Sequence, residues 1–274
     1  MGTKQAYWTL IVIILSSIAL TQSLFAAPHP INGIVTMASK KEGKKKSVKK
    51  PASVSKSTKK KGKRKPVQVV IPKSKAKKYA KVAQTMKYSE RCREEFVSED
   101  GLGEWGKFVK RELASGQFQN LLTNTKAFKN VCPGFRTMSR DERKNLWVFI
   151  LMSMSHYESS CRPQVEAQGP HGIAKGLLQL HEGAENRYAH WDRDRICKKG
   201  DSQNPKESLQ CTLSMLDGQV ERFNSIFFEG SYWDVLRNVK RPSTHAAKIK
   251  TAIQMLPGCG SRAVASNGGS FGPG

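Results

Sequence analysis

Two short stretches decide the fold of this chain: Ser155-His156-Tyr157-Glu158-Ser159-Ser160-Cys161 and, further on, Gly176-Leu177-Leu178-Gln179. The first closes a long run in which apolar residues recur at the i, i+3, i+4, i+7 spacing of one helix face. That face consists of Leu146, Phe149, Ile150, Met154 and Tyr157, with Ser153 between them. At the start of the run, Ser139 and Glu142 have the spacing of a capping box. The pattern therefore predicts a helix from Ser139 to Tyr157, with Glu158 at its end.

A carboxylate at the end of a buried helix, against an apolar wall, has its charged form desolvated, so we expect the pKa of Glu158 to be raised. A raised pKa suits a general acid that works near neutral pH, as glycoside cleavage requires. The helix pattern alone leaves open that Glu158 is only the last residue of a helix, with its side chain exposed to solvent. The second stretch favours the catalytic interpretation.

Glu158-Ser159, followed after a short polar loop by Ala174-Lys175-Gly176-Leu177-Leu178-Gln179, resembles the two leading motifs of the lytic transglycosylase and goose-type lysozyme superfamily. Leu178 stands where that family usually has Met. The resemblance extends from about Leu146 to Phe227 and continues more weakly to Cys259. It implies a lysozyme-like fold, all-α with a small β-hairpin.

The resemblance also implies roles for individual residues. Glu158 would be the catalytic acid, Ser159 would support it, and Gly176, Leu178 and Gln179 would line the sugar cleft. Two family features are missing: His171 and His181 stand where goose-type lysozymes have Asp, and there is no Tyr-Asn-x-Gly motif. We therefore expect Tyr232 or Trp233 to supply the cleft aromatic, and Glu182 or Glu185 to position water.

These features predict an exported enzyme that cuts the β-1,4 MurNAc-GlcNAc glycan strand of peptidoglycan by lysozyme-type hydrolysis, without cofactor or metal. Three alternatives remain open. One is a lytic transglycosylase, which closes the muramic 6-hydroxyl onto C1 to give 1,6-anhydro products. Another is a lysozyme specialised for deacetylated peptidoglycan, suggested by the acidic groups of the flanking loops, Glu166, Glu182, Glu185, Asp192 and Asp194. The third is a cationic wall-binding protein without catalysis.

The N-terminus, residues 1–27, has the features of a secretory signal peptide: Lys4, an apolar core from Leu10 to Leu20, and a small-residue cleavage zone near Ala26-Ala27. The apolar core is short for a membrane span, although an uncleaved anchor is the alternative. We expect a periplasmic or secreted protein. The six cysteines all follow this segment, and an even number in an exported chain predicts three disulfides, with Cys197–Cys211 as the best single pair.

Positive charge is concentrated in one segment. Between Ser39 and Lys87 there are 20 Lys and Arg against one acid, Glu42, whereas residues 88–274 contain 26 basic and 21 acidic residues. We expect residues 28–87 to be disordered, because so polar a segment buries too little apolar surface to offset its ordering entropy. Either it binds anionic envelope polymers or lipids, or it is a solvated linker. Because export removes the chain from the cell's nucleic acids, we expect no nucleic-acid partner.

The folded domain is expected at residues 88–259, as a monomer, followed by a loose Gly/Ser tail at 260–274. Helices are predicted at Glu104–Ala114, Gln117–Phe128 and Lys206–Phe228, with a short one from Tyr232 to Arg237 and a last one that is capped by Ser243 or Thr244 and runs through Leu256. Pro163 and the glycines that follow it indicate a loop or hairpin over 162–175, and Gly176 is expected to start another short helix towards Tyr188. No zinc motif, Walker loop or nucleophile elbow is present in the sequence.

Overall fold

The computed structural model describes residues 70–169, 172–182, 197–198, 200–238 and 244–260. Over these ranges the chain is mostly helical with two small antiparallel sheets, so the predicted fold class is confirmed. The helices are α2 (Lys73–Thr85), α3 (Glu90–Phe96), α4 (Glu104–Ala114), α5 (Gln119–Thr123), α6 (Arg140–Ser159), α7 (Pro205–Phe223) and α8 (Thr244–Gln254). Short 3-10 turns are η1 (Thr125–Phe128), η2 (Pro133–Thr137), η4 (Asp201–Gln203) and η5 (Asp234–Leu236).

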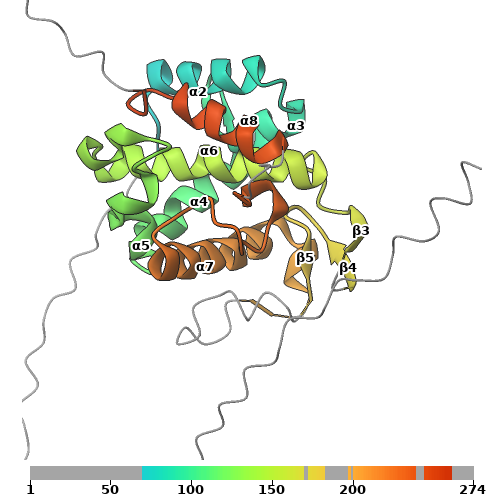
Figure 1. The fold of residues 1–274 in the computed structure, drawn as a ribbon. Coiled ribbons are helices and arrows are strands. Elements are labelled where there is room, and N and C mark those ends of the chain that lie inside the picture. The colour runs from blue at the N-terminus through green and yellow to red at the C-terminus, as the bar shows by residue number, and fades with distance from the viewer. Residues whose placement is uncertain (1–69, 170–171, 183–196, 199, 239–243, 261–274) are drawn as a thin grey trace, which may run out of the picture. The chain divides into compact units, whose positions relative to one another are not determined.

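Both sheets are local. Strands β1 (Val97–Ser98) and β2 (Gly101–Leu102) form a small ladder. The second sheet has the order β3-β4-β5, with β3 at Glu166–Gly169, β4 at Gly172–Lys175 and β5 at Leu180–His181. The predicted hairpin over 162–175 is therefore confirmed, and it lies just beyond the helix end that carries Glu158 (Figure 1).

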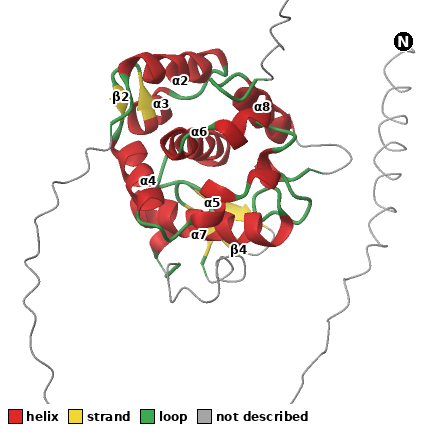
Figure 2. Ribbon diagram, turned by 90° about the vertical axis from the view of Figure 1, so that its left-hand side faces the viewer, coloured by secondary structure: helices red, strands yellow, loops and turns green. Residues whose placement is uncertain are grey.

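Helix α6 is the centre of the domain. It packs against α3, α4, α5 and α8, and Figure 2 shows it almost end-on with the other helices around it. Every residue from Asn145 to Ser155 is buried, so the helix is enclosed on all sides here and not only on the apolar face predicted from its sequence. The predicted capping box is present: the Ser139 backbone N–H donates to Glu142 Oε2 at 2.9 Å, and the Glu142 N–H donates to Ser139 Oγ at 3.3 Å.

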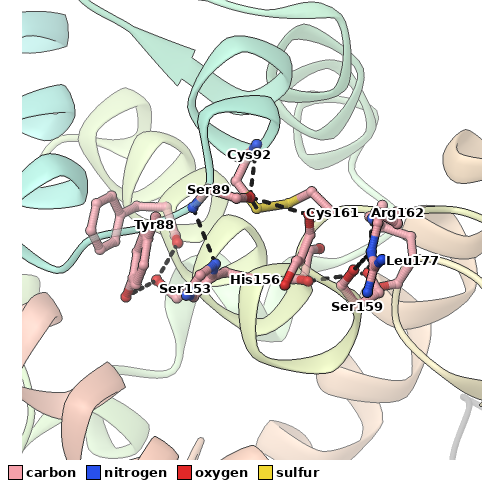
Figure 3. Close-up of a disulfide and its surroundings, with 12 residues drawn as sticks. Tyr88, Ser89, Cys92, Ser153, His156, Ser159, Cys161, Arg162 and Leu177 are labelled. Atoms are coloured by element: carbon pink, nitrogen blue, oxygen red, sulfur yellow. Dashed lines mark hydrogen bonds between the residues drawn. A yellow bond between two sulfur atoms is a disulfide. The ribbon is translucent and has the colours of Figure 1, made fainter. Parts of the chain in front are cut away.

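The C-terminal end of α6 is fixed from outside. Ser160 and Cys161 adopt left-handed conformations that stop the helix, and Cys161 forms a disulfide with Cys92 of α3 (Figure 3). Beside it, the Ser89 N–H donates to His156 Nδ1 at 3.2 Å, and Tyr88 Oη donates to Ser153 Oγ at 2.9 Å. The end of α6 is therefore attached to residues 88–92 on both sides of Glu158, by two hydrogen bonds before it and by the disulfide after it.

The other two disulfides are Cys132–Cys259 and Cys197–Cys211, and the second is the pair that the sequence predicts. Cys132–Cys259 joins the start of η2 to the segment that follows α8. Each cross-link restricts the unfolded chain, and the long separation of Cys132 and Cys259 makes that restriction large.

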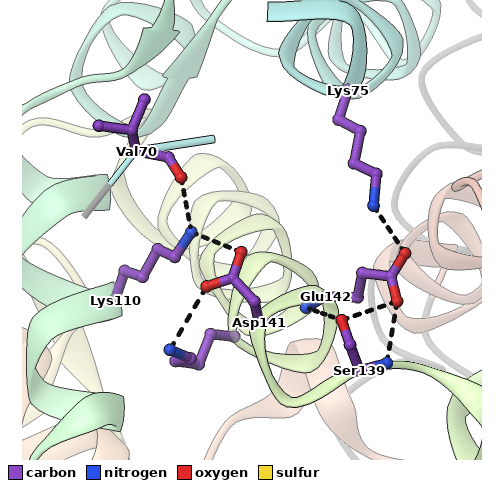
Figure 4. Close-up of polar contacts among 7 residues, drawn as sticks. Val70, Lys75, Lys110, Ser139, Asp141 and Glu142 are labelled. Atoms are coloured by element: carbon purple, nitrogen blue, oxygen red, sulfur yellow. Dashed lines mark hydrogen bonds and ion pairs between the residues drawn. The ribbon is translucent and has the colours of Figure 1, made fainter. Parts of the chain in front are cut away.

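The expected start of the domain at Tyr88 is wrong, because Val70 to Lys87 belong to the fold. Figure 4 shows two of the contacts that attach this segment to the rest: Lys75 pairs with Glu142 at 2.7 Å, and buried Lys110 donates to the Val70 carbonyl at 3.2 Å. Helix α2 buries small apolar residues and one ring between its lysines, namely Ala76, Tyr79, Ala80, Val82 and Ala83. The composition of this segment does not reveal the buried face, because lysines can flank an apolar surface while their charged ends reach water.

Three further element boundaries differ from the prediction. Gly176 does not start a helix: the chain makes a turn and enters β5, because Gly176 and Gln179 have φ of +77° and +48°, which no right-handed helix accepts. Helix α7 ends at Phe223, before the predicted Phe228, with Asn224 as a left-handed cap. The segment 117–128 is divided by Asn124 into α5 and η1.

Several predictions concern residues outside the described ranges: the signal peptide at 1–27, most of the Lys-rich segment, the tail after Gly260, and residues His171, Glu185, Asp192 and Asp194. Among the helices that the structure does describe, none combines the length and apolar character needed to cross a bilayer.

Candidate active site

Glu158 lies in the last turn of α6 and lines a pocket of about 380 Å³. Three parts of the chain form the pocket with it. The β3–β4 hairpin contributes Ala167, Gly169 and Ala174, the turn into β5 contributes Gln179 and His181, and the segment around η5 contributes Tyr232, Trp233, Asp234 and Arg237. The helix end with the catalytic candidate, the hairpin and the predicted aromatic pair therefore meet in one place.

The pKa of Glu158 is raised to about 7, chiefly because burial penalises the charged carboxylate and secondly because of the negative charge of Asp234. Helix α6 creates the burial, since it holds Glu158 at the edge of the enclosed core. A carboxyl with this pKa is about half protonated at neutral pH, and it can both deliver a proton and regain it. The predicted rise in pKa is confirmed.

The hairpin gives the pocket a wall of small residues. Ala167 of β3 pairs with Ala174 of β4, and Ala174 pairs in turn with His181 of β5. Because side chains alternate along a strand, the neighbouring Glu166 and Lys175 belong to the other face, where they form an ion pair at 3.5 Å. Gly169 leaves room for the ring of His181, which a Cβ at this position would meet, so the pocket side of the hairpin is formed by two methyl groups and this imidazole.

The turn Gly176-Leu177-Leu178-Gln179 shapes the border of the pocket through hydrogen bonds of its backbone and of the Gln179 side chain. Gly176 is required by its positive φ and by its close approach to the Ser202 carbonyl, which a Cβ would meet. Ser159 Oγ donates to the Leu177 carbonyl at 2.8 Å, so the helix end and the turn are directly joined (Figure 3). Gln179 Nε2 donates to the carbonyls of Val165 and Gly176 at 3.0 and 2.9 Å.

The predicted site residues therefore separate into two groups. Glu158, Gln179, Tyr232 and Trp233 line the pocket together. Ser159, Gly176 and Leu178 do not line it: Ser159 and Leu178 are buried, and all three hold the turn in place. The expectation that Leu178 lines the cleft is wrong, because its side chain packs in the core. Its carbonyl accepts a hydrogen bond from Trp233 Nε1 at 2.9 Å.

Of the two carboxylates expected to position water, the structure describes Glu182 alone. Glu182 does not line the pocket and lies 4.0 Å from Lys175 Nζ, which also pairs with Glu166. Glu185 lies outside the described residues. Glu166 and Glu182 therefore both pair with the ammonium group of Lys175. These are two of the acidic groups that suggested a preference for deacetylated glycan.

Asp234 and Arg237 are pocket residues that the sequence prediction missed. Their side chains form an ion pair at 3.5 Å, with Asp234 mostly in solvent and Arg237 less exposed. A sequence signal was available, because Asp234 directly follows the Tyr232-Trp233 pair that was expected at the cleft. A carboxylate directly after two aromatic residues of a cleft is a candidate for the second catalytic carboxyl group.

No protein-family model matches the sequence, and no curated protein matches it. Solved structures of Bd0314 DslA, a Bdellovibrio protein, are similar to 57% of this chain and 91% of theirs. The wild-type structure has 25% identity and a TM-score of 0.48, and two Glu-to-Gln mutants have 27% and 26% identity with TM-scores of 0.49 and 0.45. With TM-scores below 0.5, these similarities by themselves establish neither a shared fold nor a shared activity.

Proposed function

We propose that this protein is an exported peptidoglycan glycosidase that cleaves the β-1,4 MurNAc-GlcNAc strand, with Glu158 as the general acid. The observation that carries the proposal is the raised pKa of Glu158, about 7, in a pocket that also contains a second carboxylate and two aromatic side chains. The motif resemblance to lytic transglycosylases and goose-type lysozymes supports the choice of substrate.

In this reaction the protonated Glu158 gives its proton to the glycosidic oxygen as the bond to C1 breaks. Burial keeps the proton on Glu158 until then, because the neutral form is favoured in the partly enclosed pocket. After the transfer, the same burial and the nearby charge of Asp234 favour recapture of a proton from solvent. Ser159 and Gln179 act indirectly, since they fix the turn that borders the reacting carboxyl.

Hydrolysis is favoured over transglycosylation by the presence of Asp234. Glycosidases that use water generally employ two carboxyl groups, one as acid and one as base or nucleophile. A lytic transglycosylase, giving 1,6-anhydro products without water, is the second candidate, and it needs no such partner for Glu158.

Export is part of the proposal. The signal-like N-terminus motivates it, and three disulfides are consistent with an oxidising compartment. We further propose that the Lys-rich segment before Val70 binds anionic envelope polymers or lipids.

Loss of turbidity of purified cell walls tests the catalytic role. The parent protein should clear the walls, and Glu158→Gln should clear them at least 100-fold more slowly, since general acid catalysis contributes about 10²- to 10⁴-fold. Glu94→Gln is the matched control, because Glu94 is exposed on α3 away from the pocket. Equal clearance by Glu158→Gln and the parent would instead support a cationic wall-binding protein without catalysis.

A further inference from the structure

The pocket contains two carboxylates in contrasting surroundings. Glu158 is partly buried at the end of α6, whereas the Asp234 side chain is 76% exposed at the first residue of η5. Among the described residues that line the pocket, these two carry the carboxyl groups. Helix α6 and η5 pack against each other, so the two groups belong to neighbouring elements.

The segment that carries Asp234 is held in place by its neighbours. Trp233 is buried and donates from Nε1 to the Leu178 carbonyl at 2.9 Å. Tyr232 Oη accepts the backbone N–H of His181 at 2.7 Å and lies 2.9 Å from His181 Nδ1. Both residues that precede Asp234 are therefore attached to the turn and to β5, on the border of the same pocket.

Arg237 completes this arrangement from the other side. Its Nε donates to the Ser231 carbonyl at 3.0 Å, which closes the segment into a short loop, and its guanidinium pairs with Asp234. The Asp234 carboxylate is thus oriented by its own loop while most of its surface meets water. A base that must accept a proton from water needs both properties.

We propose that Asp234 is the second catalytic carboxylate of this pocket and acts as the general base that activates the attacking water. The inference rests on the proposed glycosidase function and specifies its chemistry. As the C1–O bond breaks, Glu158 gives its proton to the departing oxygen. Water oxygen bonds to C1, and Asp234 takes one proton from that water. Asp234 then releases this proton to solvent and Glu158 takes one up from solvent, which restores both groups for the next cycle.

This division of work follows from burial. The less exposed group is the one whose neutral form is stabilised, which suits the acid, and the exposed group has access to water, which suits the base. An acid and a separate water-activating base give a product with inverted configuration at C1. The β-linked strand should therefore yield an α-anomer as the first product.

Four proteins test the proposal on a soluble β-1,4-linked amino-sugar oligosaccharide: the parent, Asp234→Ala, Glu158→Gln and the control Asp100→Asn, whose side chain is exposed in the β1–β2 turn. We expect Asp234→Ala to lose about 10²- to 10⁴-fold in kcat, as removal of a general base does. Sodium azide, which needs no base, should restore cleavage by Asp234→Ala and give a glycosyl azide. It should not restore cleavage by Glu158→Gln.

A structural role for Asp234 would not produce azide rescue, so rescue separates a base from a group that merely shapes the loop. Full activity of Asp234→Ala, inactivity without rescue, or a first product that retains the β configuration would each overturn the role of Asp234. If instead Glu158→Gln retained the activity of the parent, the proposed function itself would fail. The parent and Asp100→Asn should cleave at the same rate.

Discussion

Replacing Glu158 with glutamine should make the fold more stable at alkaline pH while it removes the proposed acid. The pKa of Glu158 is raised from 4.5 to about 7 in the folded protein. Below pH 4.5 the group is protonated in both folded and unfolded chains and the fold loses nothing. Between pH 4.5 and about pH 7 the folded state binds more protons than the unfolded state, so the free energy of unfolding falls as the pH rises through this range.

The size of the effect follows from the two pKa values. The difference between 4.5 and about 7 corresponds to about 3 kcal/mol of unfolding free energy that is lost by pH 8.5. Glutamine has nearly the same shape as the protonated side chain and carries no charge. The advantage of Glu158→Gln over the parent should therefore grow by about 3 kcal/mol between pH 4 and pH 8.5.

Urea unfolding of the parent and Glu158→Gln, followed by far-UV circular dichroism at several pH values, measures this difference directly. Glu94→Gln serves as the control for loss of an exposed carboxylate, and its difference from the parent should stay nearly constant with pH. If the advantage of Glu158→Gln is the same at pH 4 and pH 8.5, Glu158 is not a buried, preferentially protonated group.

Three more outcomes are expected. Gly176→Ala should destabilise the domain by more than 1 kcal/mol and reduce wall clearance, because its φ of +77° and the nearby Ser202 carbonyl exclude a Cβ; thermal unfolding beside a clearance assay would show it. A chain starting at Val70 should fold like the full chain, whereas one starting at Tyr88 should unfold at markedly lower temperature because it lacks α2 and exposes the surface that Tyr79 and Ala83 cover; equal melting temperatures would contradict this. Asp234→Asn should move the alkaline limb of kcat to lower pH, since the negative charge that raises the pKa of Glu158 is gone; an unmoved limb in its residual activity would mean that Asp234 does not act on Glu158.

Local signals in the sequence were sufficient for much of the fold. The capping box of Ser139 and Glu142 acts within one turn, and the apolar period that follows it is set by helix geometry, so α6 and the place of Glu158 could be predicted. The Cys197–Cys211 disulfide closes a short loop, which also makes it a local feature. The rise in the pKa of Glu158 followed from its position at the end of a buried helix.

What the sequence did not reveal depends on contacts between distant segments. Lys110 is buried beneath the chain at Val70, and no pattern around either residue indicates that contact. Gly176 lies against the carbonyl of Ser202, which is far along the chain and leaves no room for a Cβ, whereas the apolar residues after Gly176 predict a helix. Asp234 enters the pocket because Trp233 reaches the Leu178 carbonyl, again a contact across many residues.

Mass spectrometry of the fragments released from purified peptidoglycan by the parent and by Glu158→Gln tests the central claim most directly. We predict that the parent releases muropeptides with intact reducing ends and that Glu158→Gln releases almost none. Products lighter by one water would show a transglycosylase in place of a hydrolase. The same reducing-end products, released by Glu158→Gln as fast as by the parent, would contradict the assignment of Glu158 as the catalytic acid.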